Sequence, residues 1–234
     1  MKKIVALLLF VSLVSNAQTS VFNSLLSKNV DTKGNVNYKG LKADEAKLDT
    51  YLSYLEKTDP SSWSTNKQKA FWINAYNAYT IKLILENYPL KSITKIKKKG
   101  KNAWKISFAK VGSKTYTLDH IEHKILRAKL FDPRIHVGVN CASGSCPKLH
   151  NVAFTEANID AELEKLMKSF INDSKRNKLN KKNTIHISEI FNWFKDDFTK
   201  DGSVIDYINK YADNKVDADA KIHYLPYDWN LNGK

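Results

Sequence analysis

One segment near the middle of the chain gathers the residue types that carry thiol or metal chemistry. Both cysteines of the 234-residue sequence, Cys141 and Cys146, lie in a Gly- and Ser-containing stretch, and His136 and His150 flank them. Loops at the ends of regular elements commonly carry binding and catalytic side chains. Three interpretations of this segment are open.

The first interpretation is a structural disulfide between Cys141 and Cys146. The cysteine count is even, and Gly144 allows the loop to turn between the two thiols. Because the closed loop would be short, the chain-entropy gain would be about 2 kcal/mol. A disulfide would occupy the thiols and leave the segment with a structural role.

The second interpretation is a nucleophilic thiol at Cys141, with His136 or His150 as the base. Such a thiol needs a lowered pKa, supplied by a histidine or by a helix N-terminus. We expect residues 134–140 to form a strand. The spacing would then place His136 and Cys141 on opposite faces, unless the strand bends before the cysteine.

The third interpretation is a zinc site made by the same two cysteines and two histidines. Cysteine and histidine are the usual ligands of structural zinc. The spacing between them in this sequence does not match that of a usual zinc finger. We therefore expect no resident metal and no other cofactor.

Two further clusters contain side chains that could support chemistry. Asn74 and Asn77 share one face of a strongly apolar helix, where they either tie the helix to a neighbouring loop or orient a catalytic group. The segment 119–123 contains two histidines, but Asp119 and Glu122 are explained as a capping pair at the start of a helix.

The elements that must position these residues are mainly helical. Helices are expected over residues 22–30, 41–57, 65–88, 119–131, 156–172, 189–197 and 203–211. A hairpin is expected around Gly112 and Ser113, and short extended segments over 184–187 and 222–227. Because these elements show no regular βαβ alternation, we predict one α+β domain with a small sheet around the buried helix 65–88.

The N-terminus predicts export. Residues 1–17 combine two lysines, a short apolar run and a small-residue cleavage site, which is typical of a signal peptide removed near Ala17. The mature domain, residues 18–234, would then be soluble and periplasmic or secreted, because no other segment is long and apolar enough to span a membrane. This compartment would permit a disulfide.

The formal net charge of +14 comes largely from lysine runs at residues 95–101 and 175–182. Such runs are usually solvated loops, and they could also attract an anionic envelope polymer or a membrane surface. An exported chain without a nucleic-acid-binding motif is not expected to bind nucleic acid.

Four segments together resemble the DUF547 family. They are FWINAYNA (71–78), LDHIEHKILR (118–127), DPRIHVGVNCAS (132–143) and LPYDW (225–229). The resemblance implies a family whose function is unknown, with exported bacterial members. It also implies a cysteine at the position of Cys141 but not always at that of Cys146, which favours a special role for Cys141.

Two functions are therefore predicted as alternatives. One is a non-catalytic binding module of the cell envelope. The other is a thiol-dependent hydrolase or acyl-transferase acting on peptide or amide bonds, with Cys141 as nucleophile. In the second, Asn74 or Asn77 would orient the base or stabilise the oxyanion, by loose analogy with papain- and transglutaminase-like enzymes.

Overall fold

The structure is a computed structural model that describes residues 18–233. The predicted signal peptide lies outside the described residues and stays a prediction. The described part is α+β, as predicted, with helices in the majority and three separate two-stranded sheets among them. None of its helices is long and apolar enough to cross a membrane.

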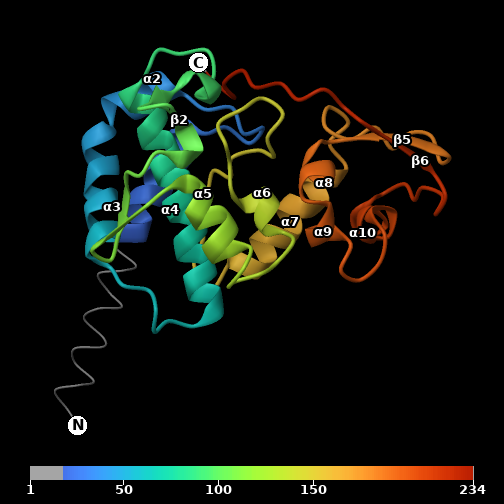
Figure 1. Cartoon of the computed structure of the whole chain (residues 1–234), viewed down its shortest axis with the longest axis horizontal. Coiled ribbons are helices and arrows are strands. Elements are labelled where there is room, and N and C mark those ends of the chain that lie inside the picture. The colour runs from blue at the N-terminus through green and yellow to red at the C-terminus, as the bar shows by residue number, and fades with distance from the viewer. Residues whose placement is uncertain (1–17, 234) are drawn as a thin grey trace, which may run out of the picture.

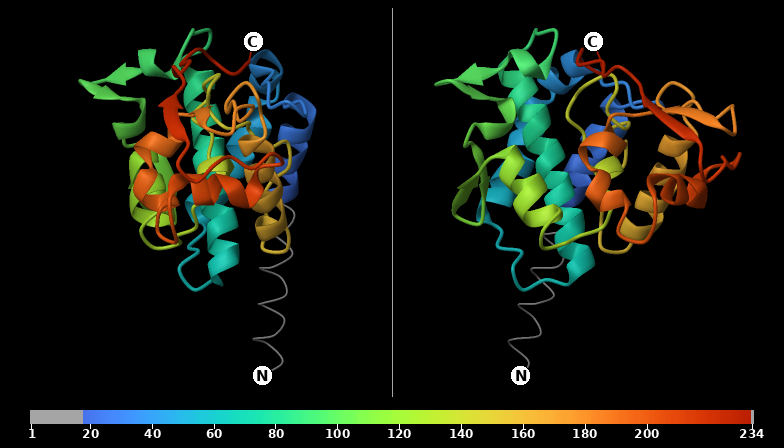
Figure 2. Two further views of the ribbon diagram at one scale, coloured as in Figure 1. Left: turned by 90° about the vertical axis from the view of Figure 1, so that its right-hand side faces the viewer. Right: turned by 45° about the vertical axis from the view of Figure 1, so that its right-hand side comes forward.

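Helix α4 (Thr65–Glu86) forms the centre of the fold, as its apolar sequence predicts. Buried side chains occur on every face of it, so neighbours must cover it on all sides. Figures 1 and 2 show α3 (Glu45–Lys57) on one side of α4 and α7 (Ile159–Ile171) on the other. The cap is Ser64, one residue before the predicted Thr65.

The other helices surround this centre. The first described residues, 18–29, are helical, in agreement with the predicted helix 22–30. The predicted helix 41–57 is divided at Asp44, whose backbone conformation separates α2 from α3. The remaining helices are α2 (Tyr38–Ala43), η1 (Ile93–Lys95), η2 (Ala103–Lys105), α5 (Leu118–His120), η3 (Ile121–Leu126), α6 (Ile135–Gly138), α8 (Ile190–Trp193), α9 (Lys195–Phe198) and α10 (Val204–Tyr211).

The strands pair locally, except in one sheet. β1 (Lys97–Lys98) pairs antiparallel with β2 (Lys101–Asn102), and β3 (Ala109–Val111) with β4 (Lys114–Tyr116) around the predicted Gly112–Ser113 turn. β5 (Thr184–Ile187) pairs parallel with β6 (Lys221–Tyr224). The small sheet predicted around the central helix is thus three separate ladders at the periphery (Figure 1).

The predicted strand 134–140 is wrong, because this segment is the short helix α6 followed by a loop. Asp132 starts the helical turn: its side chain accepts from the Arg134 N–H at 2.9 Å, and its carbonyl accepts from the Ile135 N–H at 3.0 Å. A short apolar run does not distinguish a buried strand from a buried helix. His136 and Cys141 therefore do not lie on opposite faces of a strand.

The last described residues, 225–233, form an extended C-terminal segment that returns from β6 across the molecule (Figure 1). It is fastened to the cysteine loop by backbone hydrogen bonds, including Gly144 N–H to the Asn230 carbonyl at 2.8 Å and Ser145 N–H to the Asp228 carbonyl at 3.1 Å. A Cβ at Gly144 would lie 2.8 Å from Asp228 Oδ2, so a larger residue there would displace the Asp228 side chain. The fold thereby brings the C-terminal segment to Cys141.

Candidate functional site

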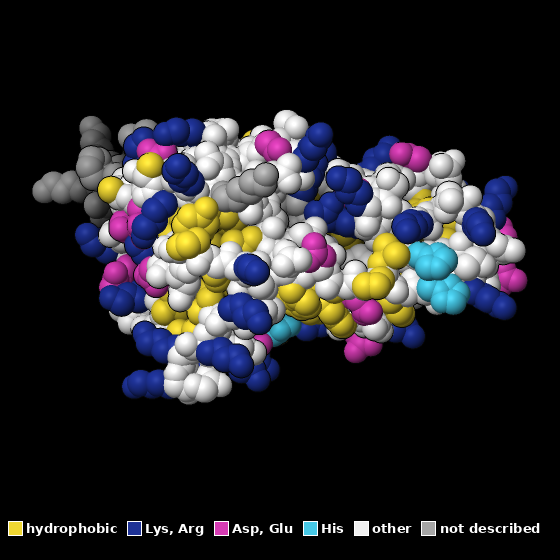
Figure 3. Space-filling model, turned by 90° about the horizontal axis from the view of Figure 1, so that it is seen from above, with side chains coloured by type: hydrophobic (Ala, Val, Ile, Leu, Met, Phe, Trp, Pro, Cys, Tyr) yellow, Lys and Arg dark blue, Asp and Glu magenta, His cyan; other side chains and the backbone are white. Residues whose placement is uncertain are grey.

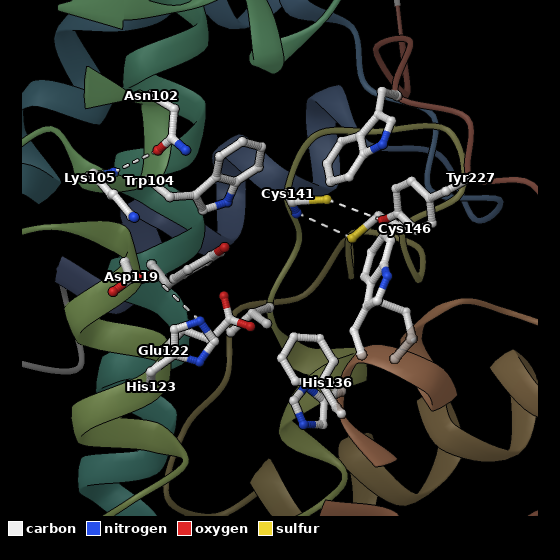
Figure 4. Close-up of a pocket in the computed structure, with 16 residues that line it drawn as sticks. Asn102, Trp104, Lys105, Asp119, Glu122, His123, His136, Cys141, Cys146 and Tyr227 are labelled. Atoms are coloured by element: carbon white, nitrogen blue, oxygen red, sulfur yellow. Dashed lines mark hydrogen bonds and ion pairs between the residues drawn. The ribbon is translucent and has the colours of Figure 1, made fainter. Parts of the chain in front are cut away.

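A cavity of about 270 Å³ opens beside Cys141 (Figure 4). Residues from α4, η2, α5, η3, α6, α8 and the C-terminal segment line it. Figure 4 shows Cys141, Cys146 and Tyr227 together, with Asp119, Glu122 and His123 on another wall and His136 at the far end. Aromatic rings form much of the surface: Tyr76, Trp104, Trp193, Phe194, Tyr227 and Trp229.

The Cys141 thiol is partly exposed and has hydroxyl groups for neighbours. Its Sγ lies 3.0 Å from Ser143 Oγ and 3.4 Å from the Tyr227 hydroxyl. Hydrogen bonding from Cys146, and then from Ser143 and Tyr227, outweighs the effect of burial and lowers the pKa of Cys141 to about 7. A thiol with this pKa is substantially thiolate near neutral pH, and the thiolate is the nucleophilic form.

Cys146 is the buried member of the cysteine pair. Burial raises its pKa, and the thiolate character of Cys141 raises it further. Its Sγ accepts the backbone N–H of Cys141 at 3.2 Å. Both cysteines are free thiols in the structure, so the predicted disulfide is not formed in this state.

The loop that carries Cys141 is held in an unusual backbone conformation. Ala142 has a φ of 60°, a region that side chains other than glycine rarely adopt. Asn140 fixes this turn, because its Oδ1 accepts the Ala142 N–H at 2.9 Å and its Nδ2 donates to the Pro147 carbonyl at 2.8 Å. Residues held in such conformations concentrate at functional sites.

Asn74 and Asn77 do not reach the cavity; both bind backbone groups. Asn74 exchanges hydrogen bonds with the carbonyl and N–H of Phe154, at 2.7 and 3.0 Å. Asn77 donates to the Gly138 carbonyl and accepts from the Asn140 N–H, both at 2.8 Å. The geometry matches the structural alternative, in which the amides tie α4 to neighbouring loops.

Replacing Asn77 with alanine is expected to destabilise the protein by about 2–4 kcal/mol, because two buried backbone groups lose their partner. Chemical denaturation of N77A measures this loss. The control is N180A, which truncates an exposed asparagine and should stay within about 0.5 kcal/mol of the wild type. Equal stability of N77A and N180A would contradict the structural role of Asn77.

His136 lines the cavity but is held by an acidic partner. Its Nε2 lies 2.8 Å from Asp197 Oδ2, and its ring stacks on Phe194 at 4.1 Å between centroids. Burial lowers the pKa of His136, while hydrogen bonds from His136 and Arg127 hold the pKa of Asp197 well below its usual range. The Asp197 carboxylate therefore occupies Nε2 of the His136 imidazole.

His150 is not part of the site. It is buried near α7, where its Nε2 lies 3.0 Å from Glu162 Oε2, and it does not line the cavity of Cys141. The two cysteines and two histidines are thus not brought together as a zinc set. Among residues 18–233, no group of three or more His, Cys, Asp and Glu side chains is placed to hold a metal ion.

In the described residues, no histidine hydrogen-bonds to Cys141 Sγ. His123, like His136, lines the cavity, but its ring nitrogens face Asp119 at 3.6 Å and Arg127 at 3.0 Å. The thiol's low pKa therefore arises from hydroxyl and thiol donors and not from an imidazole.

Glu122 is the site residue that sequence reasoning missed. The predicted capping role of Asp119 and Glu122 is wrong, since Thr117 caps this helix by accepting from the His120 N–H at 2.9 Å. Glu122 instead lies in the π-helical turn η3, a geometry that is frequent at functional sites. Its side chain lines the cavity, and burial raises its pKa above the ordinary value.

The other missed residues come from the last quarter of the chain. Asp197 binds His136, while Trp193, Tyr227 and Trp229 form one aromatic wall of the cavity. The motif LPYDW at 225–229 was the available signal for two of them. The spacing along the sequence does not indicate that the LPYDW motif lies beside Cys141.

The comparisons with known proteins concern the centre of the chain. Residues 60–171 match the model of the family described as "Protein of unknown function, DUF547". This range includes Glu122, His136 and both cysteines, whereas Asp197 and the aromatic wall follow it. No curated protein and no solved structure matches the chain. Residues 60–171 therefore carry a DUF547 domain.

Proposed function

We propose that the protein is a thiol-dependent hydrolase or acyl-transferase that acts on peptide or amide bonds, with Cys141 as the nucleophile. The observation that carries this proposal is the placement of Cys141 at the wall of an aromatic cavity, with its Sγ beside the Ser143 and Tyr227 hydroxyls. These contacts and the one with Cys146 lower the pKa of the thiol to about 7. Enzymes commonly lower the pKa of a nucleophilic thiol in this way.

The first step forms a bond between Cys141 Sγ and the carbonyl carbon of the substrate. As the sulfur loses its charge, the Tyr227 hydroxyl, which accepts from Ser143 at 3.1 Å, becomes available to donate to the developing oxyanion. The C–N bond then breaks, and the Glu122 carboxylic acid gives its proton to the leaving amine. Water then attacks the thioester while the Glu122 carboxylate takes its proton, which releases the acid, restores the Glu122 acid form and regenerates the thiolate. Attack of an amine in place of water transfers the acyl group with the same proton transfer to Glu122.

The proposed roles differ from the usual thiol-enzyme arrangement. His136 would act as a positioning residue, because its Nε2 is engaged by Asp197. Glu122 would be the proton donor, because burial raises its pKa above the ordinary value. A raised pKa keeps a carboxyl group in its acid form closer to neutral pH, as general-acid catalysis requires.

A matched pair of cysteine variants tests the proposal. Incubation with p-nitrophenyl acetate should add one acetyl group to the wild type and to C146S, and none to C141S, as measured by intact mass at early times. The alkylation rate with iodoacetamide should rise through an inflection near pH 7, since the thiolate forms above the pKa. In Y227F that inflection should move upward, because one donor to the thiolate is lost.

Failure to acylate Cys141, together with alkylation no faster than that of a free thiol, would contradict the proposal. The second candidate would then stand, a binding module of the cell envelope. The aromatic lining of the cavity and the absence of a histidine contact to Cys141 in the described residues favour that candidate. It predicts ligand binding with no acyl adduct.

Export and redox state belong to the same proposal. The signal-like residues 1–17 support delivery outside the cytoplasm, where a Cys141–Cys146 disulfide is an alternative resting state. Non-reducing intact mass distinguishes the two states, because the disulfide form is lighter by two hydrogens and resists alkylation. The lysine-rich loops support an anionic binding partner.

A further inference from the structure

The longest acid-free stretch of the chain contributes residues to the wall of the Cys141 cavity. Between Glu86 and Asp119 the sequence contains nine lysines and no aspartate or glutamate. β1 and β2 form a hairpin within this stretch, and η2 follows them directly. Residues 95–105 are called the basic hairpin here.

The lysines of the basic hairpin have no acidic partner in the described protein. Lys97, Lys98 and Lys99 are exposed, and no ion pair joins them to another residue within 18–233. Further along, Lys110 does pair with Glu56, at 3.0 Å. Figure 3 shows Lys and Arg side chains on the projecting lower edge, beside exposed hydrophobic side chains. This local positive charge is therefore available to a ligand.

The base of the basic hairpin is also a wall of the cavity. Asn102, Trp104 and Lys105 line it, and Trp104 packs edge-on against Trp229 at 5.7 Å between centroids. Trp229 in turn stacks on Trp193 at 5.8 Å. A ligand bound among these tryptophans therefore lies against the base of the basic hairpin.

We infer that the substrate is an acidic peptide, which inserts one apolar or aromatic side chain among the tryptophans and directs its flanking carboxylates to the basic hairpin. This inference rests on the proposed function, because it names the substrate of the Cys141 site. Aromatic walls bind flat apolar groups, and a cluster of one charge sign at a cleft steers ligands of the opposite sign. The tip of the hairpin has lysines and Gly100 but no apolar side chain to insert into a membrane, so a lipid surface fits less well.

The test uses the C141S protein, which binds without reacting. Its tryptophan fluorescence is titrated with an end-blocked peptide of glutamates around one central phenylalanine, and with the matching glutamine peptide. The glutamate peptide should bind on the order of tenfold more tightly at low salt, and this advantage should shrink as salt screens the charges. The triple change K97E/K98E/K99E should weaken its binding on the order of tenfold.

The matched control is K175E/K181E/K182E, an equal charge reversal in the other lysine run, which Figures 1 and 2 place on the β5–β6 side of the molecule. This control should change the affinity for the glutamate peptide by less than about twofold, because salt screens charges that are far from the bound peptide. Equal weakening in both triple variants, or equal affinity for both peptides, would overturn the inference. The inference would also be overturned if neither peptide bound, whether or not the protein bound anionic vesicles or an anionic glycan.

Failure of this inference is separable from failure of the proposed function. Acetylation of Cys141 by p-nitrophenyl acetate involves no acidic group, so the basic hairpin variants should retain it. Loss of peptide selectivity with normal acetylation would reject only the substrate class. Loss of acetylation in the wild type would reject the thiol chemistry itself.

Discussion

Replacing Asp132 with alanine is expected to lower the free energy of unfolding by about 3–5 kcal/mol, because it leaves a buried cation without its partner. Lys69 Nζ on α4 lies 2.8 Å from Asp132 Oδ2, and the side chains of both residues are only 8% exposed. Arg134 binds the same carboxylate at 2.8 Å. The ion pair joins the central helix to the start of α6, so its loss should also reduce the order of the segment that leads to Cys141.

The matched control is Asp160→Ala, which removes a second partner of Arg134 from an exposed position. Asp160 Oδ1 lies 3.1 Å from Arg134 Nη2, but the Asp160 side chain is 58% exposed. Exposed pairs are usually worth less than about 1 kcal/mol. Urea denaturation of the two variants compares them directly, and similar small losses would show that the buried pair does not stabilise the fold.

The same carboxylate predicts part of the acid sensitivity of the protein. Burial alone would raise the pKa of Asp132, but hydrogen bonds from Arg134 and Lys69 lower it to about 2 from an ordinary value of 3.8. Because the folded-state pKa is the lower one, the stabilisation is present above about pH 4 and is lost as the pH falls toward 2. Between about pH 4 and pH 2 the free energy of unfolding of the wild type should fall by about 2 kcal/mol through this group. The D132N variant should lack this part of the fall.

The centre of the fold follows from local sequence patterns. The apolar residues and flanking breakers of α4 predict its position, and the Gly112–Ser113 turn predicts the β3–β4 hairpin. Both depend on interactions within a short stretch of chain. The few apolar residues of α6 fit either a strand or a helix, and contacts around Asp132 decide between them.

Only part of the candidate site could be predicted from the sequence, because its other residues come from distant segments. Cys141 and His136 are neighbours in the sequence, and their loop could be singled out by composition. Glu122 was assigned to a helix cap, and no local pattern predicts the π turn that places it in the cavity. Tyr227 reaches the thiol through the return of the C-terminal segment, a contact between residues 86 positions apart. Such contacts depend on the tertiary fold and not on spacing.

Replacing Glu122 with glutamine is expected to separate two steps of the proposed chemistry. Glutamine keeps the shape of the side chain but cannot give a proton to a leaving amine. Turnover of a peptide aryl amide should therefore fall about 100-fold or more, the usual size of a general-acid contribution. Acetylation by p-nitrophenyl acetate should change little by comparison, because p-nitrophenolate leaves without a proton.

Thiol alkylation should respond to the same change in the opposite direction. Ionised Glu122 raises the pKa of Cys141, so the glutamine variant should have a lower Cys141 pKa and faster alkylation by iodoacetamide at any pH where wild-type Glu122 is ionised. A variant that merely disturbed the fold would slow all three reactions together. Slower amide turnover with faster alkylation would identify Glu122 as the proton donor, and unchanged amide turnover would remove it from the mechanism. A binding module would show the alkylation change alone, because the electrostatic contact between Glu122 and Cys141 does not depend on catalysis.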